Sequence, residues 1–208
     1  MRRVVLVLLL VPAAVAAGCT RTSANTTPAT STPAGSSPAI SASPTSGPTI
    51  TGHGTFVAYT PGATAVTYDP ALVPVGATAM LTTTQTAANT RVQLTVAGLR
   101  PHRGYGAHLH TNPCGPTGDA AGPHYQHQHD PAASASRPSV NPSYANTHNE
   151  VWLDFTTDGH GSATAATTQP WTFGTNPRSL VIHAMTTKTA PGQAGTAGAR
   201  AACLTLPP

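Results

Sequence analysis

The chain of 208 residues is short of charged and aromatic side chains, which make up 8% and 5% of the sequence. Basic residues exceed acidic ones by only four, and they do not cluster with aromatic residues, so we expect no nucleic-acid partner. Long apolar runs are also scarce. Residues 4–11 form such a run, but it is too short to span a bilayer with ease.

The N-terminus is organised like an export signal. Basic residues at Met1–Arg3 precede the apolar run, and the small residues Ala16–Gly18 stand directly before Cys19. Small residues before a cysteine resemble the bacterial lipobox, in which that cysteine becomes the lipidated N-terminus. We therefore predict a lipoprotein signal peptide over residues 1–18 and lipidation of Cys19, which would anchor the protein in the cell membrane on its extracytoplasmic side. The alternative is an ordinary secretory signal.

Composition then divides the rest of the chain into a linker and a domain. Residues 19–50 are almost entirely Ser, Thr, Pro, Ala and Gly, which cannot bury enough apolar surface to fold. They predict a disordered stalk, and residues 51–208 predict one domain with a sizeable core.

Short strands and turns dominate the predicted domain. Val92, Leu94 and Val96 alternate with polar residues, which is typical of a half-buried strand. Similar segments without a convincing helix predict an all-β fold, a Greek-key sandwich or barrel. The expected strands are 56–59, 65–68, 77–84, 90–96, 105–110, 151–155, 162–166, 180–183 and 201–206. Residues 111–149 predict a long loop, and loops of this length inside a domain are usually functional.

The chain has three cysteines. If Cys19 carries lipid, Cys114 and Cys203 remain as a candidate disulfide pair in an oxidising compartment. An unpaired buried thiol is the alternative for either one.

Four histidines in three segments predict a metal site. His108 and His110 in G-A-H-L-H are two residues apart, so a strand would present both imidazoles on one face and Ala107 and Leu109 on the other. His183 ends the apolar segment S-L-V-I-H, and His124 follows a Gly-Pro turn in A-G-P-H-Y.

These segments together resemble the copper/zinc superoxide dismutase family over roughly residues 55–206, with C-G-P and G-T-A-G-A-R-A-A-C as further matches. The resemblance implies copper bound by the four histidines, with His124 also as the bridge to zinc and a carrier of a proton. It implies that Arg200 guides the superoxide anion, and that Cys114 and Cys203 form the family's intrasubunit disulfide.

The zinc half of the family pattern is altered. His127, His129, His148 and Asp154 are the zinc candidates, but their spacing is not the usual one. The segment after His183 also lacks the acidic residue that commonly links the two metal sites, and Glu150 or Asp154 is a candidate substitute. Two hypotheses stay open: a copper-only or atypical zinc site, and a rearranged zinc site that uses His127 or His129.

Two functions are consistent with these features. The first is an anchored superoxide dismutase that converts external superoxide to dioxygen and hydrogen peroxide. The second is a surface lipoprotein of the same fold that binds copper with little or no turnover. A structural or adhesive domain without a metal is a weaker third hypothesis.

Overall fold

The computed structural model describes residues 47–134 and 136–208. The predicted signal peptide, Cys19 and most of the predicted linker lie outside these residues. The first described strand, β1, starts at Thr49, two residues before the expected start of the domain at residue 51. None of the helices in the described part of the chain has the length and apolar character needed to cross a membrane.

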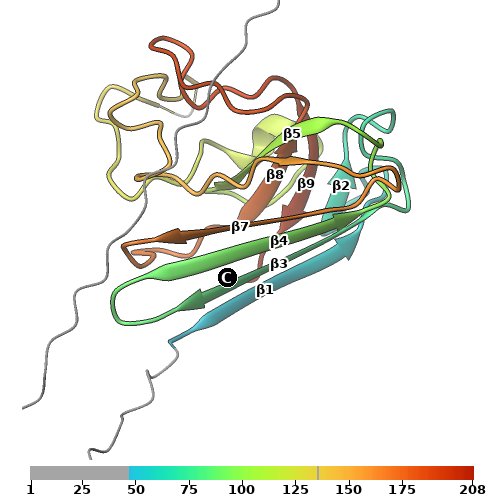
Figure 1. The fold of residues 1–208 in the computed structure, drawn as a ribbon, viewed down its shortest axis with the longest axis horizontal. Coiled ribbons are helices and arrows are strands. Elements are labelled where there is room, and N and C mark those ends of the chain that lie inside the picture. Colours follow the sequence, from blue (N-terminus) through green and yellow to red (C-terminus); the bar gives the residue numbers. More distant parts are fainter. Residues whose placement is uncertain (1–46, 135) are drawn as a thin grey trace, which may run out of the picture. The chain divides into compact units, whose positions relative to one another are not determined.

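The described residues form two antiparallel sheets, as Figure 1 shows. One sheet has the strand order β1-β3-β4-β7 and the other β2-β9-β8-β5-β6. Among the described residues, one 3₁₀ helix, η1 (Gly118–Ala121), lies in the long loop after β5. The predicted all-β architecture is confirmed. The strands are β1 (Thr49–Thr55), β2 (Ala65–Thr67), β3 (Thr78–Gln85), β4 (Thr90–Ala97), β5 (Gly104–His110), β6 (Phe155–Thr156), β7 (Ala163–Gln169), β8 (Ser179–His183) and β9 (Arg200–Thr205).

Strand β1 differs from the sequence-based expectation. The predicted strand 56–59 contributes only an isolated bridge between Val57 and Val66, and the true edge strand precedes it. The sequence did not predict β1, because the strand contains Gly52 and Gly54 and glycine is unfavourable in most strands. Here they fit a narrow space: a Cβ on Gly52 would lie 2.5 Å from Leu206 and one on Gly54 2.6 Å from Ala65.

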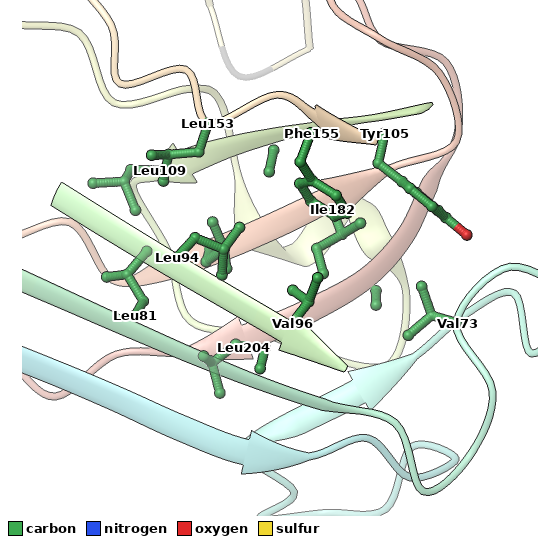
Figure 2. Close-up of a cluster of buried hydrophobic side chains, with 14 of the residues drawn as sticks. Val73, Leu81, Leu94, Val96, Tyr105, Leu109, Leu153, Phe155, Ile182 and Leu204 are labelled. Carbon is green, nitrogen blue, oxygen red and sulfur yellow. The ribbon is translucent and has the colours of Figure 1, made fainter. Parts of the chain in front are cut away.

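The core fills the space between the two sheets (Figure 2). Val92, Leu94 and Val96 are almost fully buried, which confirms the alternation predicted for β4. Leu109 from β5 and Ile182 from β8 meet them from the other sheet. Full burial of one such side chain contributes about 1.5–3 kcal/mol, so this core is the main source of stability and holds β5 and β8 rigidly.

Strand β5 is an inner strand of the five-stranded sheet, between β8 and the short edge strand β6. Its register with β8 sets His108 opposite Val181 and Gly106 opposite His183. Ala107 and Leu109 enter the core, so the alternation of the strand turns His108 and His110 to the opposite face. The two predicted faces of the H-x-H segment are confirmed.

Candidate metal centre

Four histidines converge on one point at the outer face of β5. One nitrogen of each of His108, His110, His124 and His183 lies within 4.8 Å of the others. His183 ends β8. His124 reaches the cluster from the long loop, where its backbone forms an isolated antiparallel β-bridge with His110. This set is the one cluster of three or more metal-binding side chains found in residues 47–134 and 136–208.

Each imidazole has one nitrogen held by a neighbouring group. The partners are Thr187 Oγ1 for His108 Nε2 at 2.7 Å, the Gly122 carbonyl for His110 Nδ1 at 2.9 Å, Glu150 Oε2 for His124 Nδ1 at 2.8 Å, and the Gly198 carbonyl for His183 Nδ1 at a weaker 3.4 Å. The second nitrogens of His108, His110 and His183 are buried without any partner. A buried polar atom without a partner is costly, and a metal ion would satisfy all of these at once. The residues therefore fit a four-histidine metal site.

Burial keeps the imidazoles of His108, His110 and His183 neutral, as metal ligation requires. Desolvation, reinforced by the neighbouring His124, lowers the pKa of His108 and of His110 well below the usual value. Desolvation also lowers the pKa of His183 to about 3. The unprotonated nitrogens are thus available to a metal at neutral pH.

Gly122 shapes the loop that holds His110. Its φ of 74° lies in the left-handed region, and a Cβ there would lie 2.7 Å from Thr111 Oγ1. This conformation follows η1 and lets the Gly122 carbonyl accept the His110 hydrogen bond, which fixes the proton on Nδ1 and leaves Nε2 for a metal.

Glu150 is a buried carboxylate beside His124, 2% exposed. Its Oε2 accepts hydrogen bonds from His124 Nδ1 and, at 2.7 Å, from Trp152 Nε1. Its Oε1 accepts a third from Gln126 Nε2 at 2.8 Å. Glu150, one of the two candidate substitutes for the missing acidic residue, therefore holds Nδ1 of His124.

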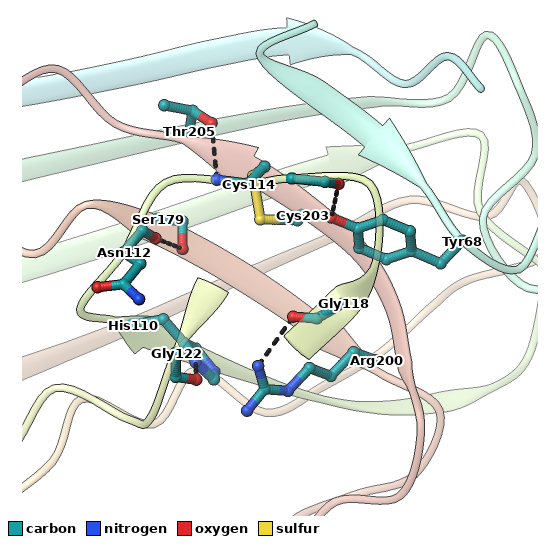
Figure 3. Close-up of a disulfide and its surroundings, with 11 residues drawn as sticks. Tyr68, His110, Asn112, Cys114, Gly118, Gly122, Ser179, Arg200, Cys203 and Thr205 are labelled. Atoms are coloured by element: carbon teal, nitrogen blue, oxygen red, sulfur yellow. Dashed lines mark hydrogen bonds between the residues drawn. A yellow bond between two sulfur atoms is a disulfide. The ribbon is translucent and has the colours of Figure 1, made fainter. Parts of the chain in front are cut away.

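Arg200 begins β9 beside the cluster, and Figure 3 shows its guanidinium close to His110 and Gly122. Its Nη1 donates to the Gly118 carbonyl of η1 at 2.8 Å. A disulfide joins Cys114 and Cys203, as the cysteine count and the resemblance predicted, so the loop that carries η1 is tied to the strand that follows Arg200. Arg200 is thereby held between two covalently linked segments.

A pocket of about 270 Å³ opens beside the histidines. His124, His183 and Arg200 line it together, with apolar walls from Pro123, Ala197 and Val140. A small anion in this pocket would meet a guanidinium and two of the four imidazoles.

The zinc candidates are not gathered into a second site in the described ranges. His127 is exposed and stacks on Trp171 with ring centroids 4.8 Å apart. His129 and His148 are exposed, and Asp154 accepts two hydrogen bonds from Thr187. Glu150 also holds Nδ1 of His124. The four zinc candidates therefore do not fit a zinc site of the family type.

Sequence reasoning missed Thr187, Gln126 and Trp152, which contact the groups around the histidines. One signal pointed to Thr187: it stands four residues after His183, in the segment where the family commonly has an acidic residue. Strand alternation places Trp152 on the same face as Glu150, two residues away, but nothing in the local pattern marked Gln126.

Comparisons with known proteins give one family. No curated protein matches the chain significantly. Among solved structures, the copper/zinc superoxide dismutase from Brucella abortus is similar, with 15% identity over 77% of this chain and 98% of that chain and a TM-score of 0.46. A family model described as copper/zinc superoxide dismutase matches residues 75–205, well over half of the sequence. The chain therefore belongs to the copper/zinc superoxide dismutase family.

Proposed function

We propose that the protein is an extracytoplasmic superoxide dismutase with copper held by His108, His110, His124 and His183. The observation that carries this proposal is the convergence of four imidazoles within 4.8 Å of one another, three of which have a buried nitrogen without a partner. Copper, when bound there, would supply one-electron chemistry between its two oxidation states, to which imidazole ligands are suited. The reaction converts two superoxide anions and two protons to dioxygen and hydrogen peroxide.

Arg200 attracts and orients the substrate. Its guanidinium keeps its charge at any physiological pH and shares the pocket with His124 and His183. Superoxide is a small anion, so a fixed cation in a partly apolar pocket raises its local concentration and donates hydrogen bonds to it.

His124 is placed to handle a proton. It is less buried than the other three histidines, with 15% of its side chain exposed, and it lines the pocket. Because Glu150 holds Nδ1, Nε2 is the atom that would bind copper and, whenever it is not bound to copper, the atom that can carry a proton to the peroxide product.

The site works with copper and without zinc in this proposal. Glu150 supports His124 from the side where a family zinc ion would lie, and its three accepted hydrogen bonds hold the carboxylate in place. Elemental analysis of protein purified without added metal tests this point. One copper and no zinc per chain is expected, whereas stoichiometric zinc that is lost in His127→Ala or His129→Ala would favour the rearranged zinc site.

The extracytoplasmic location rests on the sequence of the N-terminus and on the disulfide, since disulfides persist in oxidising compartments. We propose a lipid anchor at Cys19. Metabolic labelling with a radioactive fatty acid is expected to mark the wild-type protein and not Cys19→Ser, while equal labelling of both would contradict the anchor.

Superoxide dismutation by the purified, copper-loaded full-length protein tests the activity. Arg200→Ala is expected to lower the rate with copper retained, and His183→Ala to lose both rate and copper. Arg91→Ala is the matched control, because Arg91 is an exposed cation on β4. Stoichiometric copper with a rate no better than the protein background would instead support the copper-binding lipoprotein without turnover.

A further inference from the structure

His108 contacts a hydroxyl that belongs to a distant segment. Its side chain is completely buried in β5, and its Nε2 lies 2.7 Å from Thr187 Oγ1. Thr187 in turn contacts the carboxylate of Asp154, which directly precedes β6. The Thr187 amide donates to Asp154 Oδ2 and the Thr187 hydroxyl donates to Oδ1, each at 2.6 Å.

These contacts determine the direction of the hydrogen bonds. A hydroxyl has one proton, and the Thr187 proton goes to the carboxylate, which can only accept. Thr187 Oγ1 must therefore accept from His108 Nε2–H. A neutral imidazole carries a single ring proton, so Nδ1 is left unprotonated, and Nδ1 is the nitrogen without a partner in the histidine cluster.

Asp154 cannot hold His108 by itself. Its Oδ1 lies 3.9 Å from His108 Nε2, which is too long for a hydrogen bond. The Thr187 hydroxyl fills this gap and makes a continuous path from carboxylate to imidazole.

The loop that carries Thr187 is seated directly on β5. The Gly106 amide donates to the Met185 carbonyl at 2.7 Å. A Cβ at Gly106 would lie 2.8 Å from that carbonyl and 2.7 Å from the Ala197 methyl, so only glycine allows this approach. The Lys188 amide then donates to the Thr196 carbonyl at 2.9 Å, which secures the other side of Thr187.

We propose that Thr187 and Asp154 are positioning residues that hold the His108 ring and keep its proton on Nε2, so that Nδ1 is always free for a metal. The inference rests on the proposed function only in taking the metal to be copper. Thr187 and Asp154 supply from two segments the support that the family commonly obtains from one acidic residue after the last histidine.

The test compares Thr187→Val, Thr187→Ser and Asp154→Ala in the full-length protein. The first readout is the His108 tautomer in the metal-free protein, measured by ¹⁵N NMR of the histidine side chains. Wild type and Thr187→Ser are expected to show only Nε2–H, whereas Thr187→Val and Asp154→Ala gain an Nδ1–H population. The second readout is copper affinity by chelator competition, with an expected loss of about 10- to 100-fold in Thr187→Val and recovery in Thr187→Ser.

Thr186→Val is the control, because Thr186 is the exposed neighbour of Thr187. It is expected to match wild type in both readouts. A wild-type tautomer in Thr187→Val or Asp154→Ala would overturn the proposal, as would a Thr187→Ser affinity as low as that of Thr187→Val. The tautomer is read without metal or turnover, so a failure of the proposed function, seen as absent copper binding or dismutation, is distinguishable from a failure of this inference.

Discussion

Replacing Glu150 by Gln removes a buried charge with almost no change in shape. The Glu150 carboxylate accepts hydrogen bonds from His124, Trp152 and Gln126. A glutamine retains one acceptor oxygen, which can still serve His124 and Trp152. Its amide nitrogen then faces the Gln126 side-chain nitrogen, and because both groups are donors the hydrogen bond between these two side chains is lost.

The surroundings cannot relax freely to accommodate this change. Gln126 cannot turn its amide around without loss, because its Oε1 accepts from the Asp130 amide at 3.0 Å. If the new glutamine turns instead, its nitrogen opposes His124 Nδ1–H and forces the His124 proton onto Nε2, the metal-facing atom. Either arrangement leaves a donor without its partner.

The expected magnitude follows from these contacts. An unsatisfied buried donor costs about 1–3 kcal/mol, and each of the two remaining hydrogen bonds weakens by about 1 kcal/mol when the acceptor loses its charge. We expect Glu150→Gln to lower the free energy of unfolding of the metal-free protein by about 3–5 kcal/mol. Copper affinity should fall by about 10- to 100-fold, because the group that orients His124 is weakened.

Urea unfolding and chelator competition for copper measure the two quantities. Asp158→Asn is the control, since Asp158 also accepts hydrogen bonds, from the amides of His160 and Ser162, but lies in the turn between β6 and β7. Asp158→Asn should lower the stability less than Glu150→Gln does, because Asp158 is exposed, and it should leave copper affinity unchanged. Wild-type stability and copper affinity in Glu150→Gln would refute the role given to this carboxylate.

Three further predictions concern the disulfide, the pH dependence and the substrate cation. Replacing both Cys114 and Cys203 by Ser opens a loop with a sequence separation of 89 and should lower the free energy of unfolding by up to about 4.5 kcal/mol, as measured by urea unfolding; unchanged stability would contradict this. In the metal-free protein, burial lowers the pKa of His183 to about 3, so below pH 6.5 the unfolded chain takes up a proton that the folded protein does not. The free energy of unfolding should therefore decrease as pH falls from 6.5 towards 3, by up to about 1.4 kcal/mol per pH unit for this group. Urea unfolding at several pH values should show a smaller decrease per pH unit in His183→Gln than in wild type; an equal decrease would contradict the low pKa of His183. Arg200→Ala should slow dismutation by about 10-fold or more at low salt and make the rate less sensitive to ionic strength, with copper affinity retained; an unchanged salt dependence would show that Arg200 does not steer the anion.

Much of the fold could be predicted because its signals are local. Alternation in β4 and in the H-x-H segment of β5 shows directly which side chains enter the core. Strand β1 could not be predicted in this way, since its inward positions at Gly52 and Gly54 depend on the side chains of Leu206, which directly follows β9, and of Ala65 in β2.

The sequence by itself was enough to predict the four histidines as a metal site and Cys114 with Cys203 as a candidate pair, because each lies in a short segment with a recognisable pattern, and the resemblance to the family added Arg200. Only the tertiary structure decided what supports them. Glu150 is 26 residues from His124, Thr187 is 79 from His108, and Asp154 is 33 from Thr187. The tautomers that His108 and His124 present to a metal depend on these long-range hydrogen bonds, which form only where the folded loops bring the partners within about 3 Å of each other.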